Sequence, residues 1–261
     1  NHSSDDSWKR LQTLNGSGKV HALRLEQNGG YGMGNQEGIN YAVSCLEADY
    51  VIIANPDIHV PPRCIRRVKD ALDKTQGAVA ASARVKDPMG GELFSYWTLL
   101  PLWKDLLDTG LVTRRLFKAM LNTPSYRLAY AGDEDCRLVD AVPGSFFMLK
   151  TGILTPGEIK EVFDKHIFLY YEEKVLGQKF RKMGLKTVLV TDESYVHAHS
   201  VSIDKSFKRI VDKQRLLHRS KLYYYKEYLG TGPAGMAAAR AVLGLVLAEV
   251  WFLTVVCRMR W

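Results

Sequence analysis

The tripeptide Asn55-Pro56-Asp57 directly follows the continuous apolar run Tyr50–Ala54. We predict this run to be a strand covered on both faces, because buried strands of open α/β sheets are apolar throughout. Ligands of such sheets bind beyond the carboxyl ends of the strands. The carboxylate of Asp57 could hold a hard divalent cation there, and the cation could bridge two phosphates. All three residues are also common in turns, and the tripeptide alone favours a simple turn.

Two adjacent carboxylates, Glu172 and Glu173, follow the apolar and aromatic run Phe168–Tyr171. They open a predicted helix, Glu172–Met183, whose end is marked by the C-cap residue Gly184. Acidic side chains stabilise the N-terminus of a helix, which is one sufficient reason for their presence. At the mouth of a cleft, one of them could instead act as a general base and take the proton of an attacking hydroxyl.

A glycine-rich segment runs from Asn28 to Asn35 and leads into the predicted helix Glu37–Glu47. Glycines such as Gly30 and Gly32 let the backbone approach a ligand closely, and a helix N-terminus attracts phosphate. The spacing is not that of the dinucleotide-binding fingerprint. A phosphate-binding loop and a flexible loop are therefore about equally favoured.

Two histidines, His197 and His199, alternate on an extended segment after the predicted strand Lys186–Val190. Alternating side chains of extended backbone point to opposite faces, so at most one of them faces a given cleft. A single histidine is more often a satisfied polar residue than a ligand. The metal-ligand interpretation is the less favoured one without other support.

The elements that must position these residues alternate between strands and helices. Apolar runs and periodicity predict an α/β fold with a mostly parallel sheet, right-handed crossovers and flanking helices. The predicted strands are Lys19–Leu25, Tyr50–Ala54, Ala78–Val85, Lys186–Val190 and Val139–Leu149, the last broken at Pro143-Gly144. The predicted helices are Glu37–Glu47, Pro61–Lys74, Tyr96–Leu121, Glu172–Met183, Ser206–Tyr228 and Met236–Cys257.

The composition is that of an ordinary globular protein with a basic balance. The chain has 261 residues and a formal net charge of +8, which suits a phosphate-bearing ligand or an anionic membrane surface. Its four cysteines are far apart and form no CxxC pair, so a disulfide framework and a zinc knuckle are both disfavoured. We find no nucleic-acid-binding motif and expect no nucleic-acid partner. The abrupt start at Asn1 leads us to expect that upstream residues are missing from this numbering.

The last part of the chain is basic and then apolar. Residues 205–228 carry eight lysines and arginines and a cluster of tyrosines. Met236–Cys257 follows and is apolar except for Arg240 and Glu249. A basic segment beside an aromatic belt favours a peripheral anchor on an anionic leaflet. A helix packed on the body of the protein, or on a second copy in a homodimer, is nearly as well supported.

Taken in order, these segments resemble the family 2 glycosyltransferases of the GT-A fold, particularly bacterial enzymes of the rhamnosyltransferase type. The resemblance runs from Asn1 to about Tyr228. Asn28–Ile39 resembles the glycine-rich loop beside the donor, and Asn55-Pro56-Asp57 matches the N-P-D variant of the D-x-D metal motif. Phe168–Arg181 matches the F-L-Y-x-E-D-x-x-L-x-x-R block. The N-terminal strands of the GT-A fold would lie upstream of Asn1.

The resemblance implies a role for each motif. A Mn²⁺ or Mg²⁺ ion would be held by Asp57 and His197. Glu173 stands where most members carry the aspartate base, and Glu172 would be its helper or its rival. The implied donor-side residues are Asn28, Gly30, Gly32, Asn35, Asn55 and Asp57, and the acceptor-side residues are Pro143, Gly144 and Ser145.

The implied activity is inverting transfer of a sugar from a nucleotide-sugar to an acceptor hydroxyl in cell-surface polysaccharide synthesis. The implied donor is dTDP-rhamnose or a UDP-sugar, and the acceptor is a saccharide or a lipid-linked saccharide. We expect a cytoplasmic, peripheral location on the inner face of the cell membrane. Two alternatives stay open: a nucleotidyltransferase, and a non-catalytic sugar-binding subunit. The expected division is a catalytic domain at 1–203, a basic and aromatic helix at 204–232, and an apolar helix at 233–261.

Overall fold

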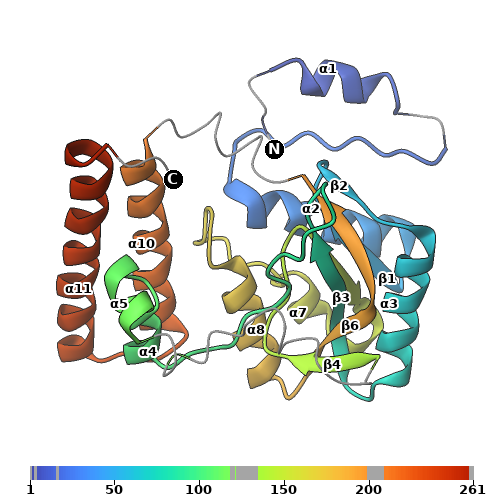
Figure 1. Ribbon diagram of the computed structural model, residues 1–261. Helices are drawn as coiled ribbons and strands as arrows, with labels where there is room; N and C mark the ends of the chain where they lie inside the picture. Colours follow the sequence, from blue (N-terminus) through green and yellow to red (C-terminus); the bar gives the residue numbers. More distant parts are fainter. Residues whose placement is uncertain are drawn as a thin grey trace.

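The computed structural model describes residues 2, 5–15, 18–117, 121, 135–198 and 209–258. Its strands are β1 (Tyr50–Ala54), β2 (Ile58–His59), β3 (Ala78–Lys86), β4 (Cys136–Val139), β5 (Phe146–Lys150) and β6 (Lys186–His197). Within this described part they form one sheet in the order β1-β5-β3-β6-β2, and β4 pairs with the first half of β6 (Figure 1). The predicted α/β class, with a central sheet flanked by helices, is confirmed.

The direction of neighbouring strands differs from the mostly parallel sheet that we expected. Among the described strands, β3 and β6 are the only parallel neighbours, and β5 lies antiparallel between β1 and β3. Because β1, β3 and β6 still share one direction, their carboxyl ends meet at one edge. The apolar run of β5 is buried on both faces, and such a run gives no sign of strand direction.

The helices are bounded as follows. They are α1 (Ser7–Gln12), α2 (Gly30–Leu46), α3 (Pro62–Lys74), α4 (Leu102–Leu107), α5 (Leu111–Leu116), α7 (Pro156–Ile159), α8 (Glu172–Lys182), α10 (Ile210–Glu227) and α11 (Pro233–Trp251). A 3-10 turn, η1 (Thr151–Ile153), and a π-helical turn, η2 (Phe252–Val256), complete the regular elements.

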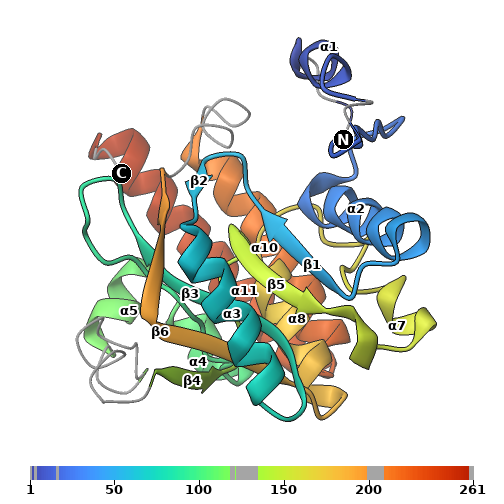
Figure 2. The ribbon, with the colours of Figure 1, turned by 90° about the vertical axis from the view of Figure 1, so that its right-hand side faces the viewer.

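The sheet is covered on both faces. Successive side chains of β5 alternate: Phe147 and Leu149 join the core under α2 and α8, whereas Phe146 and Met148 join the core under α3. This is the period of two that a strand imposes. On α3, the buried residues recur at helical spacing, so one face of that helix covers the sheet. Figure 2 shows α3 in front of the sheet.

A third core lies beside the sheet, where α10 and α11 pack together and against α4 and the start of α8 (Figure 1). Tyr224 and Tyr225 are fully buried in it, so these two tyrosines are not the exposed aromatic belt that we predicted. One face of α11 is buried here through Met236, Ala239 and Leu243. The carboxylate of Glu249 on α11 accepts hydrogen bonds from the first backbone N–H groups of α5, at Leu111 (3.2 Å) and Val112 (3.0 Å), which explains an acidic residue in an apolar helix.

Three predicted elements differ from those observed. Residues 20–25 form no strand, so the predicted strand Lys19–Leu25 is wrong. The helix expected from Glu37 begins at Gly30, and the glycine-rich segment is its first turns. The predicted helix Tyr96–Leu121 is wrong as one element, because α4 and α5 are separated by Gly110 and preceded by extended backbone.

Candidate functional site

A cleft of about 520 Å³ opens at the carboxyl ends of the strands that share one direction. Asn55 follows β1, Val85 lies near the end of β3, and His197 ends β6. The first turn of α8 closes the opposite wall. Of the residues predicted from the sequence, this cleft brings together Asn55, Pro143, Gly144, Ser145, Glu172, Glu173 and His197.

Asp57 and His197 face each other beside this cleft. The pairing of β2 with β6 sets Ile58 opposite His197, and the backbone N–H of Ala198 donates to the carbonyl oxygen of Asp57 at 3.0 Å. The carboxylate Oδ1 of Asp57 lies 3.4 Å from the imidazole Nε2 of His197, which is long for a hydrogen bond. Two neighbouring ligands of an octahedral Mg²⁺ are separated by roughly 3 Å, since each lies about 2.1 Å from the ion. The pair therefore fits two positions of one divalent cation.

Two protein ligands leave most of a coordination shell to be filled from elsewhere. Within the residues that the structure describes, no group of three or more His, Cys, Asp or Glu side chains is placed to hold a metal ion. A cation on Asp57 and His197 would take its other ligands from water and phosphate oxygens. That division is usual for Mg²⁺ at nucleotide-binding sites. The side chains of Asp57 and His197 are 25% and 11% exposed, so both remain reachable.

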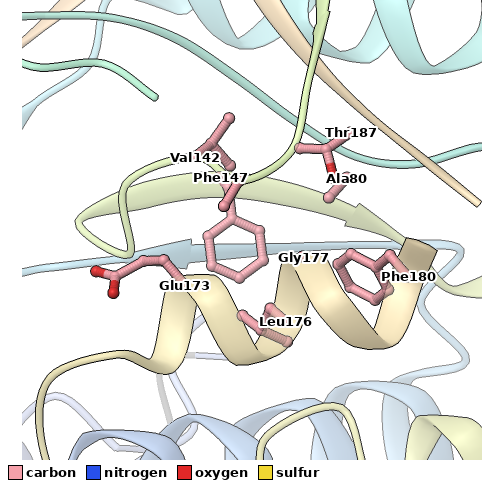
Figure 3. A pocket seen from close by; sticks show the side chains of 9 residues that line it. Ala80, Val142, Phe147, Glu173, Leu176, Gly177, Phe180 and Thr187 are labelled. Atoms are coloured by element: carbon pink, nitrogen blue, oxygen red, sulfur yellow. The ribbon is translucent and has the colours of Figure 1, made fainter. Parts of the chain in front are cut away.

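Glu172 and Glu173 occupy the first turn of α8 at the wall of the cleft. Glu172 is buried, and its Oε1 has no hydrogen-bond partner among the described residues. The backbone N–H of Gly144 donates to Oε1 of Glu173 over 3.4 Å. In Figure 3 the carboxylate of Glu173 points away from Phe147 and Phe180, which line a small cavity of about 10 Å³ between α8 and β5. That cavity holds no more than one water, so the wider cleft is the substrate-sized space.

The pKa values of both glutamates are raised. Burial raises the pKa of Glu172 to about 8, and the neighbouring charge of Glu173 adds to the effect. Burial also raises the pKa of Glu173, while the Gly144 N–H and the ammonium of Lys174 oppose that rise. Both carboxyl groups therefore hold a proton more tightly than a carboxyl group in water does, and the two adjacent groups titrate as a pair.

Two consecutive tyrosines in left-handed backbone aim this turn at the cleft. Tyr170 and Tyr171 have φ angles of 69° and 75° immediately before α8. A bulky residue in this region costs about 1–3 kcal/mol, and such strain persists only where the surroundings enforce it. The hydroxyl of Tyr171 donates to the buried carboxylate of Asp105 at 2.5 Å, which holds the turn from the α4 side. The backbone reversal is thus maintained by packing outside the cleft.

The turn at Pro143–Ser145 forms the wall next to the first turn of α8. The hydroxyl of Tyr31 donates to the Gly144 carbonyl oxygen at 2.5 Å, and the Ser145 hydroxyl lies 2.7 Å from that of Tyr195. A side chain at position 144 would meet the Tyr31 hydroxyl at 3.0 Å and Oε1 of Glu173 at 3.2 Å. Glycine therefore allows this turn to approach both groups.

The predicted donor-side residues Asn28, Gly30, Gly32 and Asn35 do not line this cleft. Asn28 and Gly32 line a separate cavity of about 850 Å³ on the other side of α2. Asn35 donates to the Tyr31 carbonyl within α2 at 3.0 Å. Gly30 has a φ of +86°, and a Cβ there would lie 2.0 Å from the carbonyl oxygen of Phe168. In this structure the glycines let α2 pack against the segment before α8, and Tyr31 is the residue of the segment that reaches the cleft.

Comparisons with known proteins find likenesses among solved structures. No family model matches the chain, and no curated protein matches it. Among solved structures, the chain is similar to the crystal structure of GalNAc-T7 with UDP, GalNAc and Mn²⁺, with a TM-score of 0.49 and 13% sequence identity. The match covers 96% of this chain and 47% of that one, so the chain spans about half the length of its match.

Several residues of the site were missed by sequence reasoning. Phe94 and Trp97 line the cleft, although Trp97 was predicted to lie in a long helix that begins at Tyr96. Lys174 lies one residue beyond the glutamate pair and reaches a buried carboxylate, Asp105. Lys174 could have been noticed in the sequence, because it directly follows two glutamates in the first turn of a predicted helix. The aromatic pair carries no local signal, because its position depends on a bridge between Trp97 and Ala141.

Proposed function

We propose that this protein is a metal-dependent glycosyltransferase that moves a sugar from a nucleotide-sugar to an acceptor hydroxyl with inversion. One observation carries the proposal. One cleft has a carboxylate–imidazole pair suited to a divalent cation beside it, with His197 in its lining, and two glutamates with raised pKa values in its wall. The first can face a diphosphate and the second can accept a proton, which are the two chemical needs of glycosyl transfer from such a donor.

Residues on the two sides of the cleft have different roles in the proposed reaction. Asp57 and His197 would hold Mn²⁺ or Mg²⁺, which when bound neutralises charge on the departing diphosphate. On the other side of the cleft, Glu173 accepts the proton of the acceptor hydroxyl. The hydroxyl oxygen of the acceptor forms a bond to the anomeric carbon while the bond between that carbon and the diphosphate oxygen breaks. One displacement of this kind inverts the anomeric carbon and needs no nucleophilic carboxylate, unlike a retaining glycosidase.

Glu173 suits the role of base better than Glu172. A base must be ionised at the working pH, and its proton affinity should be high enough to receive a proton. Burial supplies the affinity at Glu173, while the Gly144 N–H stabilises its ionised form. Glu172, with a pKa of about 8, is mostly protonated at neutral pH and can donate a hydrogen bond from its place on the wall.

The donor and acceptor are proposed from the order of the motifs along the chain. A dTDP-rhamnose or UDP-sugar donor and a saccharide or lipid-linked acceptor suit a bacterial enzyme of cell-surface polysaccharide synthesis. The turn at Pro143–Ser145 and the aromatic pair Phe94 and Trp97 would contact the acceptor, because sugar rings stack on aromatic faces and both groups line the cleft. A nucleotidyltransferase would act instead on nucleoside triphosphates.

The proposal is tested by the release of nucleoside diphosphate from a panel of nucleotide-sugars with Mn²⁺, with EDTA, and with nucleoside triphosphates as the rival substrates. Glu173→Gln should lower transfer by about 10²–10⁴-fold and keep donor binding, because it removes only the proton acceptor. Glu227→Gln is the matched control, since Glu227 pairs with Lys226 on the exposed end of α10. Near wild-type turnover by Glu173→Gln would refute the base assignment.

The cation site is tested separately by calorimetric titration of the nucleoside diphosphate. Asp57→Asn and His197→Ala should each abolish the part of the affinity that depends on Mn²⁺. The residual affinity should equal that of the unmodified chain in EDTA. Equal affinities with and without EDTA in the unmodified chain would contradict a cation site here.

We also propose that the protein works at the surface of an anionic membrane. Within the described residues, one helical stretch, Pro233–Val256, is long and apolar enough to cross a bilayer, yet α11 packs on α10 along one face. Its other face exposes Leu245, Trp251 and Phe252, and α5 beside it exposes Leu116. A helix that packs on the protein along one face and exposes apolar side chains on the other suits a position at the membrane interface. The net charge of +8 favours anionic lipid.

Co-sedimentation with vesicles of anionic and neutral lipid tests this location. Leu245→Gln should weaken binding to anionic vesicles, because Leu245 is 72% exposed on the apolar face of α11. Leu138→Gln is the control, because Leu138 is 57% exposed on β4 beside the sheet. Equal binding of both variants would argue for an interface with another copy of the chain.

A further inference from the structure

A second cavity adjoins the cleft on the side of α4, α5 and α10. Its volume is about 540 Å³, and it shares Phe94, Trp97, Tyr171, Lys174 and Leu217 with the cleft. Its other charged lining residues are Lys221 on α10 and the ion pair of Arg114 with Asp108 at its rim. The cavity is thus a continuation of the cleft that carries cations.

The buried cations of this cavity outnumber the buried anion that holds them. Lys174 and Lys221 are 8% and 5% exposed, and both donate to Asp105, at 2.5 Å and 3.1 Å. Asp105 is 1% exposed, and its single charge balances only one of the two ammonium groups. A buried charge without its counter-charge is costly, so a positive charge remains that a ligand could neutralise. At the rim, Asp108 pairs with Arg114, and its charge also favours the charged form of Lys221.

Within the described part of the chain, one N–H donor of Lys174 has no hydrogen-bond partner. Its ammonium carries three N–H groups, and its hydrogen bonds go to Asp105 and to the Tyr171 hydroxyl. Burial lowers the pKa of Lys221 to about 8, and although Asp105 opposes this effect, the charge of Lys174 adds to it. Lys221 already donates to Asp105 and to the Thr109 hydroxyl. An anion bound beside both ammonium groups would therefore accept a hydrogen bond from Lys174, and its charge would oppose the lowering of the Lys221 pKa.

We infer that this cavity is a binding subsite for a phosphoryl group, held by Lys174 and Lys221 with Arg114 at the entrance. The role that we give to this phosphoryl group rests on the proposed function: it is the phosphate or diphosphate of the acceptor. Lys174 lines both spaces, so an acceptor anchored there by its phosphoryl group presents its sugar to Glu173 in the adjoining cleft. The phosphoryl group could belong to a lipid carrier or to a soluble sugar phosphate.

The subsite is tested with inorganic pyrophosphate as the probe, titrated calorimetrically into the full chain in EDTA so that no cation contributes. Lys221→Met should weaken binding at least tenfold and leave Asp105 paired one-to-one with Lys174. Lys226→Met, on the exposed end of the same helix, should bind as the unmodified chain does. If Lys221→Met does not fold, Arg114→Gln on the exposed rim decides, with a smaller loss expected.

Absence of pyrophosphate binding, or equal binding by Lys221→Met, Arg114→Gln and Lys226→Met, would overturn the inference. Mn²⁺-dependent binding of nucleoside diphosphate to the unmodified chain reports the proposed function separately. If that binding is present and pyrophosphate does not bind in EDTA, only the subsite fails. Two competitors of pyrophosphate then identify the source of the phosphoryl group. One is a soluble hexose 1-phosphate, and the other is a polyprenyl phosphate in neutral vesicles. Displacement of pyrophosphate by either competitor supports the subsite.

Discussion

Two buried carboxylate sites flank the first turn of α8, and they differ in how their charges are compensated. Asp105 accepts hydrogen bonds from Lys174, Lys221, Tyr171 and Tyr225. Glu172, which follows Tyr171 directly in the sequence, has a buried oxygen without a hydrogen-bond partner among the described residues. Burial alone would raise the pKa of Asp105, but the two ammonium groups lower it below its usual range, whereas the pKa of Glu172 is raised to about 8.

The difference separates a site that holds the fold from a site in the wall of the cleft. Cations and hydroxyls are available at the start of α8, yet they gather around Asp105 and leave the glutamates poorly solvated. A fully bonded buried network rigidifies its surroundings, and a partly bonded one costs stability. Ionisable groups kept in the costly state inside a cleft are candidates for proton transfer. We therefore assign positioning of the turn to Asp105 and chemistry to the glutamate pair.

The largest effect is expected from Asp105→Asn. This substitution keeps the shape of the side chain and leaves two buried ammonium groups without a counter-charge. Breaking a buried pair from one side costs about 3–5 kcal/mol, so the free energy of unfolding in urea should fall by that amount. The left-handed turn at Tyr170 and Tyr171 should then loosen, and transfer activity should fall although no residue of the cleft has changed.

Asp212→Asn is the control for Asp105→Asn. Asp212 also faces two cations, Arg209 at 2.8 Å and Arg215 at 3.5 Å, but those side chains are 78% and 63% exposed. An exposed pair contributes roughly 0–1 kcal/mol, so this variant should unfold nearly as the unmodified chain does. Similar losses in the two variants would mean that the burial of Asp105 has no energetic importance.

An intermediate effect is expected from pH acting on the glutamate pair. In the unfolded chain the carboxyl of Glu172 ionises near its ordinary pKa of 4.5, whereas in the folded protein it keeps its proton until about pH 8. The folded protein therefore binds more protons between these values, and its free energy of unfolding falls as pH rises from about 5 to 8. A tenfold difference in proton affinity is worth about 1.4 kcal/mol, so the fall is on the order of 3 kcal/mol.

Glu172→Gln removes this contribution together with the charge coupling between Glu172 and Glu173. The difference between the unfolding free energies of the variant and the unmodified chain should grow in favour of the variant between pH 5 and pH 8. Urea unfolding at four or five pH values measures it. If the difference in unfolding free energy does not vary with pH, Glu172 is ionised in the folded protein. Glu172 and Asp105 would then not differ in protonation.

The sequence predicted a strand or helix well where neighbouring residues alone determine it. The strand Tyr50–Ala54 and the helices starting at Pro62 and Glu172 follow from apolar runs, proline at a first turn and a glycine C-cap. The direction of β5 could not be predicted, because a strand that is apolar on both faces pairs equally well in either direction. The helix expected over Tyr96–Leu121 failed because Gly110 divides it and because the structure uses its first residues as a wall.

The site was predicted in part for the same reason. Asn55, Glu173 and His197 each lie at an element end, and three strands of one direction bring such ends together. The glycine-rich segment was given a donor-side role from its resemblance to a family loop, whereas the structure shows Gly30 accommodating the Phe168 carbonyl oxygen. The pairing of Lys174 with Asp105 spans 69 positions and depends on tertiary packing, so no local pattern announces it.

The smallest effect distinguishes two tyrosines that are both buried in the third core. The Tyr171 hydroxyl donates to Asp105 at 2.5 Å, whereas the Tyr224 hydroxyl is buried without a hydrogen-bond partner among the described residues. A hydrogen bond to a charged group contributes about 1.5–3 kcal/mol, so Tyr171→Phe should destabilise by that amount. Tyr224→Phe removes an uncompensated polar group and should be neutral or slightly stabilising. Because the two rings are in contact and lose the same atom, equal destabilisation of both variants would show that the Asp105 network adds nothing beyond packing.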